Sequence, residues 1–456
     1  MNDRSAFLAA LAGIVGPANL LTDPDLVAPY LEEPRGLYRG RALAVARPGT
    51  TAEVAAVVAA AAAAGVAIVP QGGNTGLVGG QIPFNGEVLL SLKRLNRVRH
   101  VDKAGANMIV EAGAILANVQ RAADDAGLLF PLSLASEGSA TIGGNLSTNA
   151  GGVHVLRYGM ARELVLGLEV VLADGRVLDM LRTLRKDNTG YDLKQLFLGA
   201  EGTLGIITAA VLKLFPKPAE TVTAFAAVRD PASAIALLAR LQSATGGQIS
   251  AFELVPRIGV ELAMRHIPAT SDPLSAPSPW YVLVEATSGA GFDLKRVVED
   301  ALSNAVTDAV IATSEAQRVA LWKLRESLSE AQKKEGPSLK HDIAVPVAAI
   351  PDFIAQATAA VLKVLPDARP VTFGHLGDGN LHFNFNVPDV SKRAEIARIV
   401  HDCVHEFGGS ISAEHGIGVM KRDELLRYKS AAEIGVMRAL KRTLDPKNIL
   451  NPGKVV

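Results

Sequence analysis

The sequence has little of several features that commonly determine a protein's partners. Its 456 residues include one cysteine, Cys403, which excludes an internal disulfide, so the fold depends on its core alone. Acidic and basic residues balance at 46 each, and aromatic residues make up only 5% of the chain. Because such a chain has no strong field for nucleic acid or an anionic membrane, a small-molecule ligand is the expected partner.

The chain also lacks an apolar run long enough to cross a bilayer. The longest, Val54–Pro70, is mostly alanine, is interrupted by Gly65 and falls short of the roughly 20 residues that a spanning helix needs. It predicts instead a helix that begins at Thr50 or Thr51 and ends at Gly65, followed by a strand over 66–69. The first 21 residues lack a basic leader, so we expect no signal peptide. The expected location is the cytoplasm, either free or associated with the surface of a membrane.

The remaining sequence predicts an α+β fold in more than one unit, since the chain exceeds what one core organises. Between about residues 38 and 215, β-rich runs such as Glu87–Leu92 and Met108–Glu111 alternate with one helical segment, Leu116–Ala126. The stretch Phe215–Ala219 indicates a boundary, and helical periodicity over 432–444 indicates a closing helix. The predicted divisions are a first domain over 1–216, a second over 217–410, and a C-terminal segment over 411–456 that returns to the first.

Three glycine-rich loops follow one another in the first domain. Pro70–Gly80 comes directly after a predicted strand and has five glycines that let backbone amides turn toward one point, as pyrophosphate binding requires. Ser136–Gly152 and Gly199–Ile207 repeat the pattern. One such loop would also suit a tight connection without a ligand. The spacing matches neither the Walker nor the Rossmann pattern, so neither ATP nor NAD is indicated.

The segment Thr372–Asn386 carries a second candidate site, with Asp378-Gly379 as a predicted two-residue hairpin turn. Counting outward pairs Gly377 with Asn380 and His375 with His382, whose Cβ atoms would lie about 5 Å apart on one face. Alternation places His382, Asn384 and Asn386 on a polar face and the intervening leucine and phenylalanines on a core face.

Two hairpin histidines alone would also suit an exposed or hydrogen-bonded pair. The stretch Ser412–Gly418 adds Glu414 and His415. Two histidines and a carboxylate form a common set of ligands for a divalent metal.

These loops and motifs, in this order, resemble those of the vanillyl-alcohol-oxidase (PCMH-type) flavoproteins, and most closely the D-2-hydroxyglutarate dehydrogenases. The resemblance implies a PCMH-type FAD-binding domain of two α+β subdomains and a substrate (cap) domain with an antiparallel sheet flanked by helices. It implies that His375, His382 and Glu414 bind a metal, expected to be Zn²⁺. The first loop has no histidine or cysteine, so we expect non-covalent FAD. The residues implied to bind FAD are Pro70, Gly72, Gly73, Asn74, Thr75, Gly76, Leu77, Gly80, Ser136, Gly138, Ser139, Thr141, Gly144, Asn145, Thr148, Gly152, Glu201, Gly202, Ile206, Ile207 and Asn451.

A predicted helix around Ala320–Ser329 places Arg325 and Ser329 four residues apart on one face. Most helical arginines are simply solvated. The resemblance implies instead that Arg325 and Lys340 bind substrate carboxylates and that Ser329 stands where relatives carry threonine. Asn384 joins them in the predicted catalytic set, and His415 is the predicted base because an imidazole is largely neutral at physiological pH.

The predicted function is oxidation of a D-2-hydroxy acid, foremost D-2-hydroxyglutarate, to the 2-oxo acid by hydride transfer to FAD with metal assistance. A D-lactate dehydrogenase of the same family is the alternative. A zinc hydrolase would explain the metal ligands but not the glycine loops, and a flavin-binding subunit would not need the metal and carboxylate-binding residues. The expected partner is an electron acceptor such as an electron-transfer flavoprotein or a quinone. The protein is also expected to form a homodimer.

Overall fold

The computed structural model describes residues 2–303 and 305–456, and contacts divide the chain into two compact units. The first unit comprises Met1–Gly151, Met160–Lys217 and Glu414–Val456. The second comprises Pro218–Ala413 together with the short stretch Gly152–Gly159. The chain thus leaves the first unit inside the predicted boundary stretch Phe215–Ala219 and returns to it between Ala413 and Glu414.

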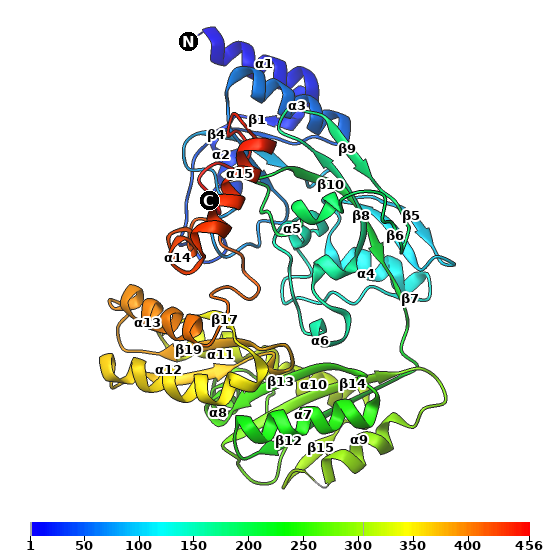
Figure 1. Cartoon of the computed structure of the whole chain (residues 1–456), viewed down its shortest axis with the longest axis vertical. Coiled ribbons are helices and arrows are strands. Elements are labelled where there is room, and N and C mark those ends of the chain that lie inside the picture. Colours follow the sequence, from blue (N-terminus) through cyan, green and yellow to red (C-terminus); the bar gives the residue numbers. More distant parts are fainter. Residues whose placement is uncertain (1, 304) are drawn as a thin grey trace. The chain divides into compact units, whose positions relative to one another are not determined.

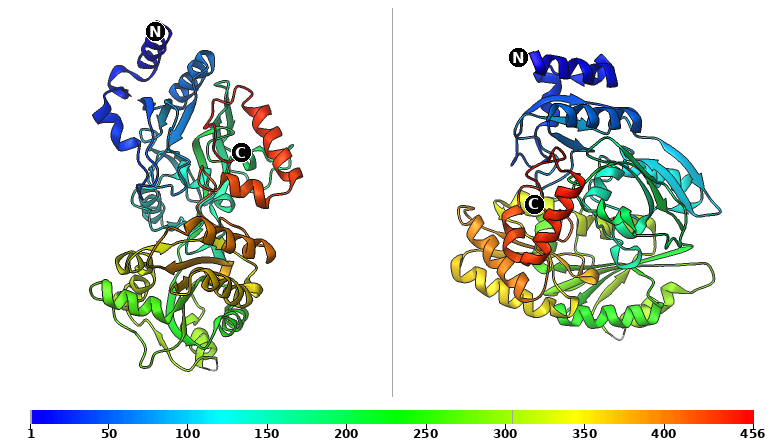
Figure 2. Two further views of the ribbon diagram at one scale, coloured as in Figure 1. Left: turned by 90° about the vertical axis from the view of Figure 1, so that its left-hand side faces the viewer. Right: turned by 45° about the horizontal axis from the view of Figure 1, so that its top comes forward.

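In the first unit, a small sheet has the order β1-β2-β4-β3, in which β2 and β3 are both parallel to β4. Its strands are β1 (Leu20–Leu21), β2 (Ala42–Ala46), β3 (Ile68–Gln71) and β4 (Glu87–Ser91). The helix α3 (Thr51–Ala64) connects β2 to β3, and α1 (Asn2–Val15) lies along it (Figure 2). Thr50 caps α3 by accepting a hydrogen bond from the backbone of Glu53, and Gly65 ends it in the left-handed conformation, as predicted. The strand after it begins two residues later than predicted.

A larger antiparallel sheet of the same unit has the order β5-β6-β10-β8-β9 (Figure 1). Its strands are β5 (Val98–Asp102), β6 (Asn107–Glu111), β8 (Val165–Val171), β9 (Val177–Met180) and β10 (Ile206–Lys213). The other elements of this unit are α2 (Pro24–Val27), α4 (Leu116–Asp125), β7 (Leu128–Leu129), α5 (Ile142–Ser147), β11 (Phe215–Pro216), α14 (Arg422–Tyr428) and α15 (Ala431–Leu444). The predicted helices over 116–126 and 432–444 correspond to α4 and α15.

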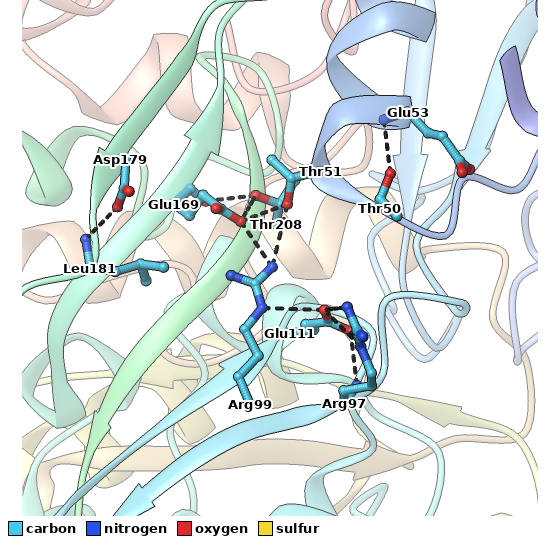
Figure 3. A network of polar contacts seen from close by, with 10 residues as sticks. All are labelled: Thr50, Thr51, Glu53, Arg97, Arg99, Glu111, Glu169, Asp179, Leu181 and Thr208. Carbon is cyan, nitrogen blue, oxygen red and sulfur yellow. Dashed lines mark hydrogen bonds and ion pairs between the residues drawn. The ribbon is translucent and has the colours of Figure 1, made fainter.

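A polar network ties α3 to this larger sheet (Figure 3). Thr51 donates a hydrogen bond to Glu169 at 2.6 Å, and Arg99 bridges Glu169 and Glu111 with 3.2 Å contacts to each. Arg97 adds a 2.9 Å contact to the buried Glu111. Because its residues come from α3, β5, β6 and β8, the network holds α3 against the larger sheet.

The second unit contains an antiparallel sheet in the order β13-β14-β12-β15. Its strands are β12 (Glu220–Val228), β13 (Ile249–Pro256), β14 (Trp280–Ser288) and β15 (Ala309–Ile311). The helices α7 (Pro231–Thr245) and α9 (Leu294–Ser303) pack on one face of this sheet (Figure 1). Buried residues of α8 (Arg257–His266), α10 (Glu315–Glu326) and α11 (Leu328–Glu335) form a core with the other face. The short helix α6 (Val155–Tyr158) packs on β13.

A further sheet of the second unit is built around β19 (Asn380–Asn386), which pairs with three strands. These are β16 (Ser338–Leu339), β17 (Asp342–Ala344) and β18 (Arg369–Phe373). The helices α12 (Ile350–Val364) and α13 (Arg393–Glu406) pack against each other beside it (Figure 1).

By length and composition, Val347–Val364 could cross a membrane. Its buried residues Ile350, Phe353, Ala357 and Val361 recur on one face, which is typical of a helix packed on a domain surface.

Candidate cofactor and substrate sites

The three glycine loops of the first unit surround a cavity of about 660 Å³. From the first loop and its flanks, the cavity is lined by Pro70, Gln71, Gly72, Gly73, Asn74, Thr75, Gly76, Leu77, Val78, Gly80 and Gln81. The second loop contributes Ser136, Ser139, Thr141, Gly143, Gly144, Asn145, Ser147, Thr148, Ala150 and Gly151. Glu201 and Gly202 of the third loop and Glu414 and His415 of the C-terminal segment also line it.

Close approach of backbone explains the glycines of these loops. A Cβ atom on Gly73 would collide with the carbonyl oxygen of Ser139, and one on Gly202 would collide with the ring of Pro70. Gly202 also has a φ of +72°, which L side chains rarely adopt. The first loop can therefore approach the second loop at Gly73, and the third loop at Gly202, because these residues have no side chain.

Two buried polar residues hold the loops together. Asn451 donates hydrogen bonds from Nδ2 to the carbonyl oxygens of Gly80 and Glu201, at 2.9 and 2.8 Å. The carboxylate of Glu201 accepts hydrogen bonds from the backbone of Ile417 and Gly418, at 2.7 and 2.8 Å, while its burial raises its pKa. The C-terminal segment thereby closes the loop cluster.

Most residues expected to bind FAD line this cavity. Gly138, Ile206, Ile207 and Asn451 do not: Ile206 and Ile207 are buried in β10, and Asn451 supports the loops from behind. Gly152 groups with the second unit. The sequence reasoning missed Gln71, whose only signal was its place inside the first loop, and Pro34 and Leu134, which carried no motif.

The polarity of the cavity wall fits FAD. Gln71 Oε1, Thr141 Oγ1 and Asn145 Nδ2 are buried, and within the described part of the chain they have no hydrogen-bond partner. Leaving such groups unsatisfied is costly, whereas a ligand with ring nitrogens, hydroxyls and phosphates can satisfy them.

In the second unit, the predicted hairpin forms with a different register. β18 pairs Phe373 with His382 rather than His375 with His382, and residues 374–379 form a wider connection containing a 3₁₀ turn over Leu376–Asp378. The two-residue turn was therefore wrong. The physical reason is that Gly374 exchanges backbone hydrogen bonds with Leu254 of β13, at 2.8 and 3.2 Å, and so leaves β19 early.

A register shift of two residues leaves the two faces of the hairpin unchanged. The rings of His375 and His382 still meet, with centroids 5.7 Å apart. The polar side chains of β19 are not exposed. Asn384 is 3% exposed, accepts a hydrogen bond from the backbone of His341 at 3.1 Å and donates one to Gln332 at 3.0 Å.

Beside His375 lies a fully buried carboxylate that the sequence did not indicate. Glu253 Oε1 lies 2.7 Å from His375 Nδ1, and Oε2 accepts a hydrogen bond from Arg325 Nε at 2.8 Å and lies 2.6 Å from its Nη2. Burial raises the pKa of Glu253, but the charges of His375 and Arg325 outweigh it and hold the pKa at about 2. We call these three residues the Glu253 cluster.

The helix predicted around Ala320–Ser329 is interrupted. Ser327 ends α10 and begins α11, so Arg325 and Ser329 lie on successive helices rather than on one continuous helix. The backbone amide of Ser327 bonds to Lys323, and its side chain makes no capping hydrogen bond at the start of α11. Lys340 Nζ donates to the backbone oxygen of Ser329 at 3.5 Å, which brings these two predicted substrate residues together.

A second buried glutamate lies on the next strand. Glu285 Oε2 accepts hydrogen bonds from Trp322 Nε1 at 2.8 Å and Thr223 at 2.9 Å and pairs with Arg318 at 3.2 Å, while Oε1 lies 3.5 Å from His154. Burial raises its pKa, but hydrogen bonds from His154 and Trp322 lower it to about 2. We call these residues the Glu285 cluster.

The fold and the loop-lined cavity define the class of protein. Residues 42–181 match the model of the FAD binding domain, and residues 217–455, more than half of the chain, match the C-terminal domain of FAD linked oxidases. The chain belongs to the FAD-linked oxidase family.

Within that family the chain is similar along its length to D-2-hydroxyglutarate dehydrogenases. It is 40% identical to a probable mitochondrial one from Oryza sativa subsp. indica, over 97% of this chain and 80% of the relative. It is 40% identical to the mitochondrial D-2-hydroxyglutarate dehydrogenase of Bos taurus, over 98% of this chain and 83% of the relative. It is 37% identical to the D-2-hydroxyglutarate dehydrogenase of the bacterium Xanthomonas citri pv. viticola, over 98% of this chain and 96% of the relative.

Solved structures confirm the α+β fold with an FAD-binding domain. A p-cresol methylhydroxylase has a TM-score of 0.78 at 18% identity, covering 100% of this chain and 97% of that one. An alkyldihydroxyacetonephosphate synthase has a TM-score of 0.77 at 20% identity, covering 98% and 84%. At these identities the likeness concerns the fold alone.

Proposed function

We propose that this protein is an FAD-dependent dehydrogenase that oxidises D-2-hydroxyglutarate to the 2-oxo acid. The observation that carries the proposal is identity of 37–40% over nearly the whole chain with relatives of that name from plants, a mammal and bacteria. The cavity among the glycine loops supports the cofactor. The family does not support the alternative of a zinc hydrolase.

Non-covalent FAD would be held by the loops that line the cavity, with the backbone of Gly72–Leu77 at the pyrophosphate and the unsatisfied polar atoms of Gln71, Thr141 and Asn145 at its other polar groups. Bound FAD supplies the acceptor for the hydride. The protein's own contribution is a wall of backbone and small side chains that would hold the flavin.

A divalent metal, with Zn²⁺ as the first choice, is proposed at His375, His382 and Glu414. Support comes from the chemistry of the donor set and from the ring contact of the two histidines. The contact of His375 Nδ1 with Glu253 is typical of metal-binding histidines. Such a metal supplies a Lewis acid for the hydroxyl and carboxylate oxygens.

The remaining predicted residues act on the substrate itself. Arg325 and Lys340 would bind its carboxylates, Ser329 would add a hydroxyl donor, and Asn384 would support the polar face of β19. His415, which lines the cavity, would accept the hydroxyl proton.

Anaerobic titration of the bound flavin tests this function. D-2-hydroxyglutarate should bleach the flavin absorbance at lower concentrations than D-lactate or D-malate. Preferential bleaching by D-lactate would contradict the proposed substrate and favour the D-lactate dehydrogenase of the same family. No bleaching by any of the acids would contradict the dehydrogenase.

The metal ligands have a separate test. His382→Ala should keep bound FAD but lose both metal and flavin reduction, whereas His100→Ala, which replaces an exposed histidine of β5, should keep all three. Full metal content in His382→Ala would contradict the ligand set.

Partners and location extend the proposal. The relatives are mitochondrial or bacterial proteins. We expect a cytoplasmic enzyme that passes electrons to an electron-transfer flavoprotein or a quinone and forms a homodimer. Reoxidation of the reduced enzyme by each acceptor, followed by flavin absorbance, would identify the acceptor.

A further inference from the structure

One carboxylate joins two side chains to which the proposed function assigns different tasks. Glu253 Oε1 contacts His375, a proposed metal ligand, and Oε2 contacts Arg325, a proposed carboxylate-binding group. The side chain of Glu253 is 0% exposed and that of Arg325 is 8% exposed. Because burying a charge is costly unless it is paired, Glu253 has to keep both partners in place.

Aromatic contacts close the Glu253 cluster into a ring. The guanidinium of Arg325 lies 5.0 Å from the centroid of Phe373, Phe373 lies 5.1 Å from His382, and His382 lies 5.7 Å from His375. Glu253 completes the circuit between His375 and Arg325. A change in the position of one member therefore affects its neighbours on both sides.

The backbone next to Glu253 and His375 is fixed as well. Leu254 follows Glu253, Gly374 precedes His375, and these two residues exchange hydrogen bonds at 2.8 and 3.2 Å. A Cβ atom on Gly374 would lie 2.5 Å from the carbonyl oxygen of Asn380 and 2.9 Å from Cα of Leu381, so a glycine is needed there. The distance between the carboxylate and the imidazole is thus set by the sheet rather than by flexible loops.

We propose that Glu253 is a positioning residue that orients His375 and Arg325 together, and so links metal binding to recognition of the substrate carboxylate. This inference rests on the proposed function. The contact at Nδ1 sets the tautomer and orientation of the imidazole and makes Nε2 the ligand nitrogen. The contacts at Nε and Nη2 set the plane of the guanidinium and make its Nη1 side the one that meets a carboxylate.

The test is Glu253→Gln in the full-length enzyme with FAD bound. An amide of the same size has one acceptor oxygen, so it cannot accept from both His375 Nδ1 and Arg325; if it accepts from Arg325, its N–H faces Nδ1 and favours the tautomer with the proton on Nε2. We expect the dissociation constant for Zn²⁺, measured by chelator competition, to rise about 10- to 100-fold. The KM for D-2-hydroxyglutarate should rise as well, while the FAD content, which depends on the first unit, stays at the wild-type level.

Glu253→Asp is the second variant, for use where Glu253→Gln does not yield folded protein. It keeps the negative charge beside Arg325 but shortens the side chain, so it should also weaken Zn²⁺ binding.

Glu285→Gln is the matched control. Glu285 is a buried glutamate on the adjacent strand with a histidine and an arginine of its own, but none of the proposed ligands contacts it in the described residues. Its Zn²⁺ affinity should equal that of the wild type. Equal loss of Zn²⁺ affinity in Glu285→Gln and Glu253→Gln would overturn the proposal, since general destabilisation would then explain both.

The outcomes separate this inference from the proposed function. Wild-type Zn²⁺ affinity in Glu253→Gln, with metal lost in His382→Ala, overturns the positioning role alone. A wild-type protein that binds no Zn²⁺ overturns the proposed metal site and the positioning role together.

Discussion

Glu253 and Glu285 occupy neighbouring strands of one sheet and have similar surroundings, but the side chains that they contact differ in their proposed roles. Ala251 pairs with Glu285 and Glu253 pairs with Leu283, so both carboxylates point to the same face of the sheet. Each is buried, contacts a histidine and an arginine, and has a pKa of about 2. The Glu253 cluster contains proposed ligand-binding groups, whereas the Glu285 cluster joins α6 and α10 to β12 and β14. Burial and a shifted pKa therefore do not identify a functional carboxylate, but its partners do.

Removing the arginine partner should give the largest contrast between the clusters. Arg325→Met leaves Glu253 fully buried with only His375 as a partner, and we expect it to lower the free energy of unfolding by about 3–5 kcal/mol. The measurement is urea denaturation followed by tryptophan fluorescence, which reports on the second unit because both tryptophans, Trp280 and Trp322, lie there.

The matched variant is Arg318→Met in the Glu285 cluster. The side chain of Arg318 is 34% exposed, so its removal should cost only ~0–1 kcal/mol. Similar losses in the two variants would show that exposure of the arginine does not distinguish the clusters.

Lowering the pH should remove the contribution of the Glu285 charge to the stability of the fold. The pKa of Glu285 is lowered in the fold from 4.5 to about 2. A lowered pKa stabilises the fold above about pH 4.5, and this contribution is lost as the pH falls toward 2. We expect Glu285→Gln to be less stable than the wild type by on the order of 3 kcal/mol at pH 7, with the difference shrinking between pH 4.5 and 2.

Urea denaturation of both proteins across this pH range measures the difference. The titratable and charged groups beside Glu285 include His154, Arg318 and Glu315, the last of which pairs with Arg318. A difference that stays constant down to pH 2 would mean that the charge of Glu285 does not contribute to stability.

Sequence reasoning succeeded where the signal was local. The glycine loops predicted a ligand cavity because close approach of backbone requires glycine at particular positions. Thr50 and Gly65 predicted the two ends of α3 because helix capping depends on residues that are neighbours in sequence. The proximity of the His375 and His382 rings was also predicted, although His375 lies beyond the end of β18 and not opposite His382.

Long-range contacts account for what was missed. The hairpin register was wrong because Gly374 pairs with Leu254, some 120 residues earlier, as the bridge between them shows. Glu253 and Glu285 each stand alone in an apolar strand, where a single glutamate gives no sign of the histidine and arginine that other elements bring to it. Only packing of α6, α10 and the loop after β18 reveals those partners.

Trp322→Phe should have a smaller effect than Arg325→Met or Glu285→Gln, and it tests a single hydrogen bond of the Glu285 cluster. The substitution keeps an aromatic ring in the core but removes the Nε1 donor that lies 2.8 Å from Glu285. Loss of a buried hydrogen bond to a charged group should cost about 1.5–3 kcal/mol, read from the remaining tryptophan, while the Zn²⁺ affinity stays at the wild-type value. Circular dichroism provides the control for the change of fluorophore, and Trp280→Phe, which leaves this donor intact, should cost less. Weaker Zn²⁺ binding in Trp322→Phe would show that the Glu253 and Glu285 clusters are coupled along the same face of the sheet. The affinity of the proposed metal site would then depend on both glutamates.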